Sequence, residues 1–145
     1  MKKFENKVVL VTGGTSGIGC ETALAFAREG ARVVVSGRRE KEGTETVELI
    51  RKAGGKALFV RADVTQEDDT VRLIKQAIEA FGRLDVAFNN AGTEGDLAPL
   101  AEATADNYQK IFDANVKGVF LSMKHEIAQM LKQGGGAIVN NASIA

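Results

Sequence analysis

The chain has few residues of the kinds that cross-link or interrupt a small fold. Its 145 residues include one cysteine, one proline, one tyrosine, one histidine and no tryptophan. The single cysteine, Cys20, cannot form a disulfide within the chain, which is typical of proteins from a reducing compartment. His125 has no second histidine beside it, so we expect neither a metal site nor a histidine-based catalytic triad.

Net charge and long apolar runs are also lacking. The 19 Lys and Arg residues balance the 19 Asp and Glu residues, which gives no reason to expect nucleic acid or an anionic membrane as a partner. No apolar run approaches the length of a membrane span, and residues 1–6 lead into a short strand rather than a signal sequence. We therefore expect a soluble, cytoplasmic protein.

Short apolar segments alternate with amphipathic ones along the whole chain. Strands are predicted at 8–11, 32–36, 56–61, 84–89 and 137–141, and helices from near 17 to 29, at 40–52, at 66–81 with Thr65 as its cap, and at 106–133. A loop at 90–104 carries the only proline, Pro99. This alternation predicts an α/β fold: a doubly wound parallel sheet in three α/β/α layers, forming a single domain over residues 1–145.

A glycine-rich turn follows the first strand, where Gly13, Gly17 and Gly19 precede a helix. Glycines let backbone N–H groups approach an anion, and a helix N-terminus favours negative charge, so a pyrophosphate is the expected ligand. Cys20 and Glu21 follow the last glycine where a kinase-type phosphate loop needs Lys and Ser or Thr, which disfavours that loop. Taken alone, the turn also fits a plain connection between a strand and a helix.

Further polar and glycine residues follow the other predicted strands. They lie at 37–39, 63, 89–92 and 143. The carboxyl ends of parallel strands meet at one edge of a doubly wound sheet, which is where ligands bind. The sequence therefore predicts a ligand site at this edge.

Five motifs resemble the short-chain dehydrogenase/reductase family, whose fold is the Rossmann fold. They are Thr12-Gly13-Gly14-Thr15-Ser16-Gly17-Ile18-Gly19, Asp63-Val64, Asn89-Asn90-Ala91-Gly92, Asn115-Val116-Lys117-Gly118 and Ala137-Ile138-Val139-Asn140-Asn141-Ala142-Ser143. In order, the resemblance implies binding of the cofactor pyrophosphate, an adenine contact, support of the central sheet and adenosine pocket, a relay asparagine in a distorted helix, and an active-site serine.

The resemblance also implies an activity. Members transfer a hydride between a nicotinamide dinucleotide and a small carbonyl or alcohol substrate, and we expect a homo-oligomer. Thr12, Gly13, Thr15, Ser16, Gly17, Ile18, Gly19, Asp63, Val64, Asn89, Asn90, Ala91 and Gly92 are the implied cofactor-binding residues, and Asn115 and Ser143 the implied catalytic ones.

The cofactor is predicted to be NADP, because the end of the second strand has no acidic residue. Members that prefer NAD carry an acidic side chain there for the ribose diol, whereas this chain has Gly37 followed by Arg38 and Arg39. A guanidinium group suits the 2′-phosphate. The alternative is that both arginines are solvated and that the cofactor is NAD.

Some of these residues also have structural interpretations. Asp63 could contribute to the cap of the next helix, and the amides of Asn89 and Asn90 could tie neighbouring loops together. Asn115 could be a partly exposed polar residue in a helix, and Ser143 a turn residue.

The family's Tyr-x-x-x-Lys pair does not occur in these residues. The only tyrosine, Tyr108, is followed four residues later by Phe112 and is predicted to be a packing or surface residue. The family's catalytic pair lies on the helix after the fifth strand, so the chain resembles a cofactor-binding portion truncated after that strand, with the strand left uncovered. We expect these 145 residues to bind dinucleotide without turnover. The alternatives are a catalytically silent nucleotide-binding module and a fragment that needs a complementary chain.

Overall fold

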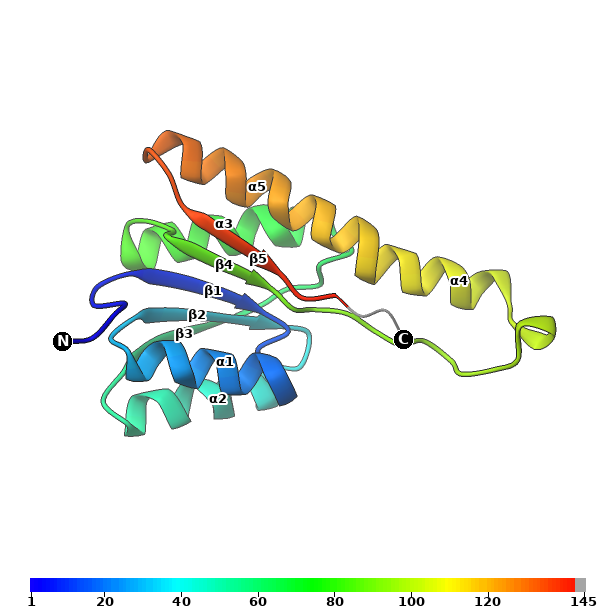
Figure 1. The fold of residues 1–145 in the computed structure, drawn as a ribbon, viewed down its shortest axis with the longest axis horizontal. Coiled ribbons are helices and arrows are strands. Elements are labelled where there is room, and N and C mark those ends of the chain that lie inside the picture. The colour runs from blue at the N-terminus through cyan, green and yellow to red at the C-terminus, as the bar shows by residue number, and fades with distance from the viewer. Residues whose placement is uncertain (143–145) are drawn as a thin grey trace.

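A five-stranded parallel sheet lies between two layers of helices (Figure 1). The structure is a computed structural model that describes residues 1–142. The strand order is β3-β2-β1-β4-β5, which confirms the predicted doubly wound α/β fold. The elements are β1 (Val8–Thr12), α1 (Gly17–Arg28), β2 (Arg32–Gly37), α2 (Glu40–Lys52), β3 (Lys56–Arg61), α3 (Glu67–Phe81), β4 (Val86–Asn89), η1 (Leu100–Glu102), α4 (Ala105–Phe112), η2 (Asp113–Lys117), α5 (Gly118–Lys132) and β5 (Ala137–Asn140).

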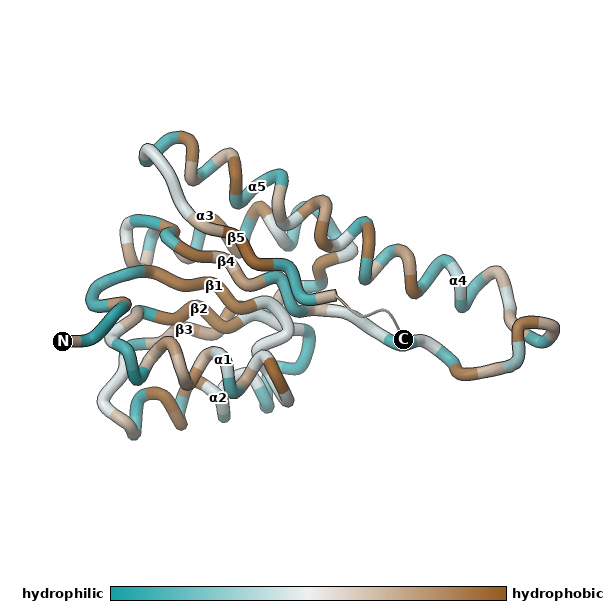
Figure 2. The backbone as a smooth tube through the Cα atoms, viewed as in Figure 1, coloured by the Kyte–Doolittle hydropathy of each residue, from teal (hydrophilic) through white to brown (hydrophobic). Residues whose placement is uncertain are grey.

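The core is built on both faces of β1, whose residues are all buried. Val8 and Leu10 pack in one apolar cluster with side chains of α3 and α5, whereas Val9 and Val11 pack in a second cluster with α1 and α2. Figure 2 shows β1 and the neighbouring strands as mostly apolar segments inside the molecule. Successive side chains of a strand point to opposite faces, so an unbroken apolar run is what a strand covered on both sides requires.

The fourth strand begins at Val86, two residues later than predicted. The backbone of Leu84 is bonded to the side chain of Gln133 instead of a neighbouring strand: its N–H donates to Gln133 Oε1 (3.0 Å), and its carbonyl accepts from Gln133 Nε2 (2.6 Å). A side chain 49 positions away thus ends the ladder, and apolar patterning does not reveal such a contact.

The predicted cap of α3 by Thr65 is wrong. The helix begins at Glu67 after Gln66, and no side chain caps it. Thr65 is bonded backwards instead, since its N–H (3.0 Å) and its hydroxyl (2.8 Å) both donate to Asp63 Oδ1. An aspartate that accepts from the residue two positions on forms a local turn, which competes with capping.

The helix predicted at 106–133 is interrupted by the π-helical turn η2, between α4 and α5. A π turn inserts one extra residue and rotates the side chains that follow it. The three segments still form one rod, whose α4 end extends beyond the sheet (Figure 1). The distortion contains Asn115, as the family resemblance implies.

The two edge strands differ in coverage. β3 buries Ala57 and Val60, whereas β5 buries none of its four side chains. Val139 in the middle of β5 is 55% exposed. The uncovered fifth strand is therefore confirmed. Within the described residues, none of the helices combines the length and the apolar character that a membrane span needs.

Candidate functional site

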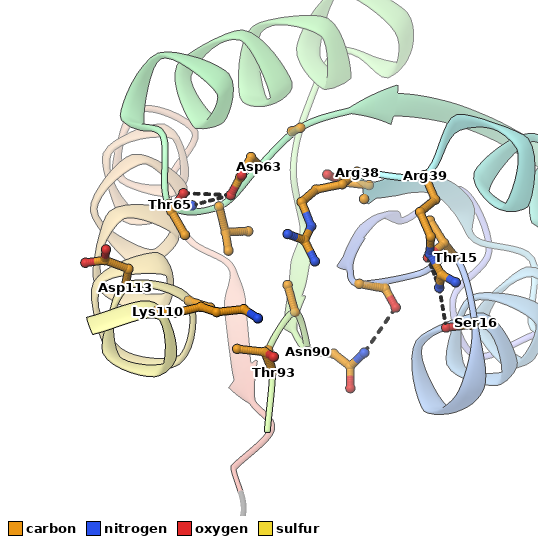
Figure 3. A pocket seen from close by; sticks show the side chains of 18 of the residues that line it. Thr15, Ser16, Arg38, Arg39, Asp63, Thr65, Asn90, Thr93, Lys110 and Asp113 are labelled. Carbon is orange, nitrogen blue, oxygen red and sulfur yellow. Dashed lines mark hydrogen bonds between the residues drawn. The ribbon is translucent and has the colours of Figure 1, made fainter. Parts of the chain in front are cut away.

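A cavity of about 730 Å³ opens at the carboxyl edge of the sheet, as the strand-end pattern predicts (Figure 3). We call it the edge cavity. It is lined by Gly13, Thr15, Ser16, Gly17, Ile18, Ser36, Gly37, Arg38, Arg39, Ala62, Asp63, Val64, Thr65, Asn90, Ala91, Gly92, Thr93, Asp106, Gln109, Lys110, Asp113 and Ala114. Its volume is that of a site for a large small-molecule ligand.

The glycine-rich turn forms one wall, and its backbone is too closely packed at Gly13 and Gly19 to leave space for a side chain. A Cβ atom on Gly19 would lie 2.0 Å from the carbonyl oxygen of Gly13, and Gly13 itself has a φ of +64°. Ser16 precedes α1 without capping it, and the first turn of the helix carries no acidic residue. The N–H groups at the N-terminus of α1 therefore form part of a wall that is suited to binding an anion.

The two arginines after β2 have different environments. Arg39 Nη2 donates to Thr15 Oγ1 (3.1 Å) and to Ser16 Oγ (2.8 Å), which ties it to the glycine-rich turn. Arg38 extends into the edge cavity (Figure 3) and forms no salt bridge within residues 1–142. The charge of Arg38 is thus available to an anionic ligand, while the hydrogen bonds of Arg39 are partly used within the protein.

Gly37 is packed against Thr15. A Cβ atom on Gly37 would lie 2.5 Å from the methyl carbon of Thr15. Any larger side chain at this position would therefore have to move Thr15, and the wall stays free of acidic groups at the end of β2.

Asp63 and Val64 line the opposite side of the edge cavity. Asp63 forms the local turn with Thr65 described above, and its N–H donates to Asp69 Oδ2 (2.8 Å). No side chain caps α3, so the interpretation of Asp63 as a contributor to the helix cap is wrong. The position of Asp63 on the wall leaves a ligand contact open.

The loop after β4 is held against the glycine-rich turn by side-chain amides and a hydroxyl. The N–H groups of Asn90 (3.1 Å) and Ala91 (3.2 Å) donate to Thr12 Oγ1. Asn90 Nδ2 donates to the carbonyl of Gly13 (3.2 Å). The loop-tying interpretation of Asn90 is thus confirmed, and Asn90, Ala91 and Gly92 also line the edge cavity.

Asn115 holds the same loop farther along. Its Oδ1 accepts from the N–H of Thr93 (2.8 Å), and its Nδ2 donates to the carbonyl of Thr93 (2.7 Å). The side chain satisfies the backbone of Thr93 on both sides, as a neighbouring strand would. Asn115 is an exposed residue that does not line the edge cavity.

Most predicted cofactor residues meet at the edge cavity, and a few do not. Thr12, Gly19 and Asn89 lie behind the lining, where they hold or shape it. Ser143 lies outside the described residues. Tyr108 is exposed and stacks on Phe112, with ring centroids 4.4 Å apart, as expected for a packing or surface residue.

Sequence reasoning missed the α4 side of the edge cavity. Asp106, Gln109 and Lys110 of α4 line it together with Asp113 of η2, and Lys110 points inward in Figure 3. Helical periodicity predicts α4 but does not say which of its polar residues face the sheet edge, so these residues left no signal in the sequence.

A buried carboxyl was also missed. Glu126 of α5 is fully buried, and burial raises its pKa to about 7 despite the hydrogen bond from Asn89, which lowers it. Ser122 and Met130, one turn away on either side, are buried too. A charged residue on an otherwise buried helix face is the signal that could have identified it.

His125 takes part in a contact between helices, as a packing residue would. Glu67 Oε1 accepts from Lys124 Nζ (2.5 Å) and lies 2.8 Å from His125 Nε2. The hydrogen bonds from Lys124, and then from His125, hold the pKa of Glu67 below its ordinary value. Across residues 1–142, no three His, Cys, Asp or Glu side chains are grouped to hold a metal ion.

Known proteins match this chain closely. Residues 7–145 match the family model described as short chain dehydrogenase. An uncharacterized oxidoreductase of Thermotoga maritima is 45% identical over 142 residues, covering 98% of this chain and 55% of that protein. Cyclohexanol dehydrogenase of an Acinetobacter species is 42% identical over 143 residues, covering 99% and 57%.

Solved structures match as well. NAD⁺-bound xylitol dehydrogenase superposes with a TM-score of 0.96 at 35% identity, over 99% of this chain and 55% of the other. Levodione reductase gives a TM-score of 0.94 at 35% identity, over 97% and 55%. The chain thus spans a little over half the length of these relatives. By sequence and by fold, it belongs to the short-chain dehydrogenase family.

Proposed function

We propose that residues 1–145 are a single dinucleotide-binding domain of an NADP(H)-dependent oxidoreductase. The observation that carries this proposal is that one cavity combines a wall shaped by glycines with the guanidinium group of Arg38, which forms no salt bridge within residues 1–142. A dinucleotide fits both features, because its pyrophosphate needs close backbone N–H groups and its 2′-phosphate needs a cation.

The residues divide by the part of the dinucleotide that they would hold. The turn from Gly13 to Gly19, shaped from behind by Thr12 and bonded to Arg39, would hold the pyrophosphate, and Arg38 would hold the 2′-phosphate. Asp63 and Val64 would contact the adenine. The adenosine would be contacted by residues Asn90 to Gly92, which are anchored by Asn89. When bound, the nicotinamide ring would supply a hydride acceptor or donor for a carbonyl or alcohol substrate.

Support for NADP over NAD comes from the end of β2. No acidic side chain is present there to repel a phosphate, and the methyl group of Thr15 occupies the space that a side chain at Gly37 would need. The xylitol dehydrogenase that superposes on this chain has NAD⁺ bound, so the choice between the two dinucleotides rests on residues of this chain.

Turnover is a separate matter from binding. The 145 residues contain no Tyr-x-x-x-Lys pair to exchange a proton with the substrate. We expect them to bind dinucleotide without reducing a carbonyl compound, with Asn115 and Ser143 as the parts of the catalytic apparatus that they do contain.

We also infer a homo-oligomer. Exposed apolar side chains follow the rod of α4, η2 and α5, including Tyr108, Phe112, Val116 and Phe120 at intervals of four residues. Such a row on a helix surface is typical of an interface. A cytoplasmic location stays a prediction.

A second candidate function has one observation in its favour. The uncovered strand β5 favours a fragment completed by a complementary chain. This chain would then bind dinucleotide as part of a two-chain assembly.

Substitution of the two arginines tests the cofactor proposal. Arg38→Ala should weaken NADPH binding roughly tenfold or more and leave NADH binding nearly unchanged, because it removes one charge-assisted contact to phosphate. Arg39→Ala is the matched comparison. It should weaken binding of both nucleotides alike, because it frees Thr15 and Ser16 of the turn. Equal affinities for both nucleotides in the unmodified chain and in Arg38→Ala, measured by fluorescence titration, would refute the NADP assignment.

A further inference from the structure

A buried polar cluster lies between α5 and the ends of β4 and β5. Glu126 Oε1 accepts a hydrogen bond from Asn89 Nδ2 (2.7 Å), and the same Nδ2 donates to Asn140 Oδ1 (3.0 Å). One side chain from each of the three elements therefore meets at Asn89. None of the three lines the edge cavity.

The cluster is costly to stability. Within the described residues, neither Glu126 Oε2 nor Asn89 Oδ1 has a hydrogen-bond partner, although both atoms are buried. Buried polar atoms without partners destabilise a fold, and an apolar side chain of similar size is often more stable in their place. Core packing does not explain a carboxyl group at this position, and such departures from good packing are expected at functional sites.

The residues next to the cluster in the chain connect it to the wall of the edge cavity, which Asn90 lines. Asn90 follows Asn89, Asn141 follows Asn140, and Asn141 Nδ2 donates to Asn90 Oδ1 (2.9 Å). The N–H of Asn141 also donates to the carbonyl of Asn89 (2.9 Å). The Asn89 side chain is thus connected, through Asn140 and its neighbour Asn141, to the Asn90 side chain that donates to the carbonyl of Gly13.

We propose that Glu126 is a positioning residue for dinucleotide binding: by holding Asn89, its carboxyl group keeps Asn90 in place on the wall of the edge cavity. Glu126 touches no ligand itself and acts through two asparagines in series. This inference rests on the proposed function, because it concerns the affinity of that same site.

The experiment measures NADPH affinity and thermal stability of the 145-residue chain side by side. Glu126→Leu should weaken NADPH binding by about fivefold, within the range found for residues that act on a site without touching its ligand. The same variant should keep or raise the melting temperature at neutral pH, because it removes a buried carboxyl. Glu126→Gln can still accept from Asn89 Nδ2 and should keep the affinity of the unmodified chain.

Met130→Val is the matched control. It truncates a buried side chain one turn along the same face of α5, without a polar contact to Asn89. It should lower the melting temperature and leave NADPH affinity of the folded protein unchanged. Opposite changes in Glu126→Leu and Met130→Val would separate positioning from general support of the fold.

Other results would overturn the inference. If the unmodified chain binds NADPH and Glu126→Leu binds it equally well, the inference fails while the proposed function stands. If Met130→Val or Glu126→Gln weakens binding as much as Glu126→Leu does, the carboxyl is only part of the packing. Glu126→Met serves as a second apolar variant, and loss of the fold in both would equally show a structural role. If the unmodified chain binds no dinucleotide, the proposed function fails first and the inference with it.

Discussion

The two edges of the sheet are built from similar strands but have different surroundings. β3 lies between α2 and α3 and buries Val60, which is 3% exposed, whereas Val139 in the middle of β5 is 55% exposed. Both strands pair in parallel along their length. The difference therefore comes from coverage by helices and not from strand pairing.

The two sides of the sheet also contribute different kinds of residues to the candidate site. The β1 to β3 side, with α1 and α2, supplies the glycine-rich turn and both arginines, and its core is closed. The β4 and β5 side supplies the asparagines and the buried carboxyl of Glu126, and its outer strand is open. We conclude that the side proposed to bind the phosphates has a closed core within these residues, while the other side is held by polar contacts.

The largest expected effect concerns the carboxyl group of Glu126, which is buried on the β4 and β5 side of the sheet. The pKa of Glu126 is raised to about 7, so its protonated form is favoured in the fold. The contribution of Glu126 to the free energy of unfolding is then largest below the ordinary pKa of glutamate. This contribution falls by about 3 kcal/mol in all as the pH rises toward about 7. Thermal unfolding at about pH 5 and about pH 8 measures this difference.

Glu126→Gln is the control for that experiment, because it cannot ionise. Its melting temperature should lose this part of the pH dependence and exceed that of the unmodified chain at the higher pH. Identical pH dependence in the two proteins would mean that Glu126 ionises in the fold as freely as in the unfolded chain.

A smaller effect tests the two edges directly. Val60→Ala should cost about 2 kcal/mol, because it removes two buried carbons and leaves space behind. Val139→Ala should change the free energy of unfolding by less than about 0.5 kcal/mol, because the side chain is largely solvated. Urea unfolding of both variants gives the two values, and equal losses would show that β5 is covered in solution.

How far the sequence predicts the fold depends on the range of the contacts involved. The bounds of α2 and β3 were predicted to the residue, because their periodicity and the Gly54-Gly55 pair are local signals. The predicted start of β4 was wrong because the side chain of Gln133, distant in the sequence, forms hydrogen bonds with the backbone of Leu84. The π turn was implied by the resemblance at Asn115 and not by helical periodicity, which treats the rod as unbroken.

The candidate site shows the same pattern. Residues that follow strand ends were predictable, because parallel strands bring their carboxyl ends to one edge. Arg38 and Arg39 are neighbours of the same type in the sequence, and only the structure distinguishes them. Arg39 is bonded to the glycine-rich turn, whereas Arg38 extends into the edge cavity. Lys110 and Glu126 were missed because their roles depend on which helix face meets the sheet.

The central claim is that this chain by itself forms a complete binding site for NADP(H). Isothermal titration of the 145-residue chain with NADPH and with NADH tests it most directly. The account predicts one NADPH bound per chain, with NADH bound more weakly, and no oxidation of NADPH when small ketones are added. No binding of either nucleotide by the folded chain would contradict it.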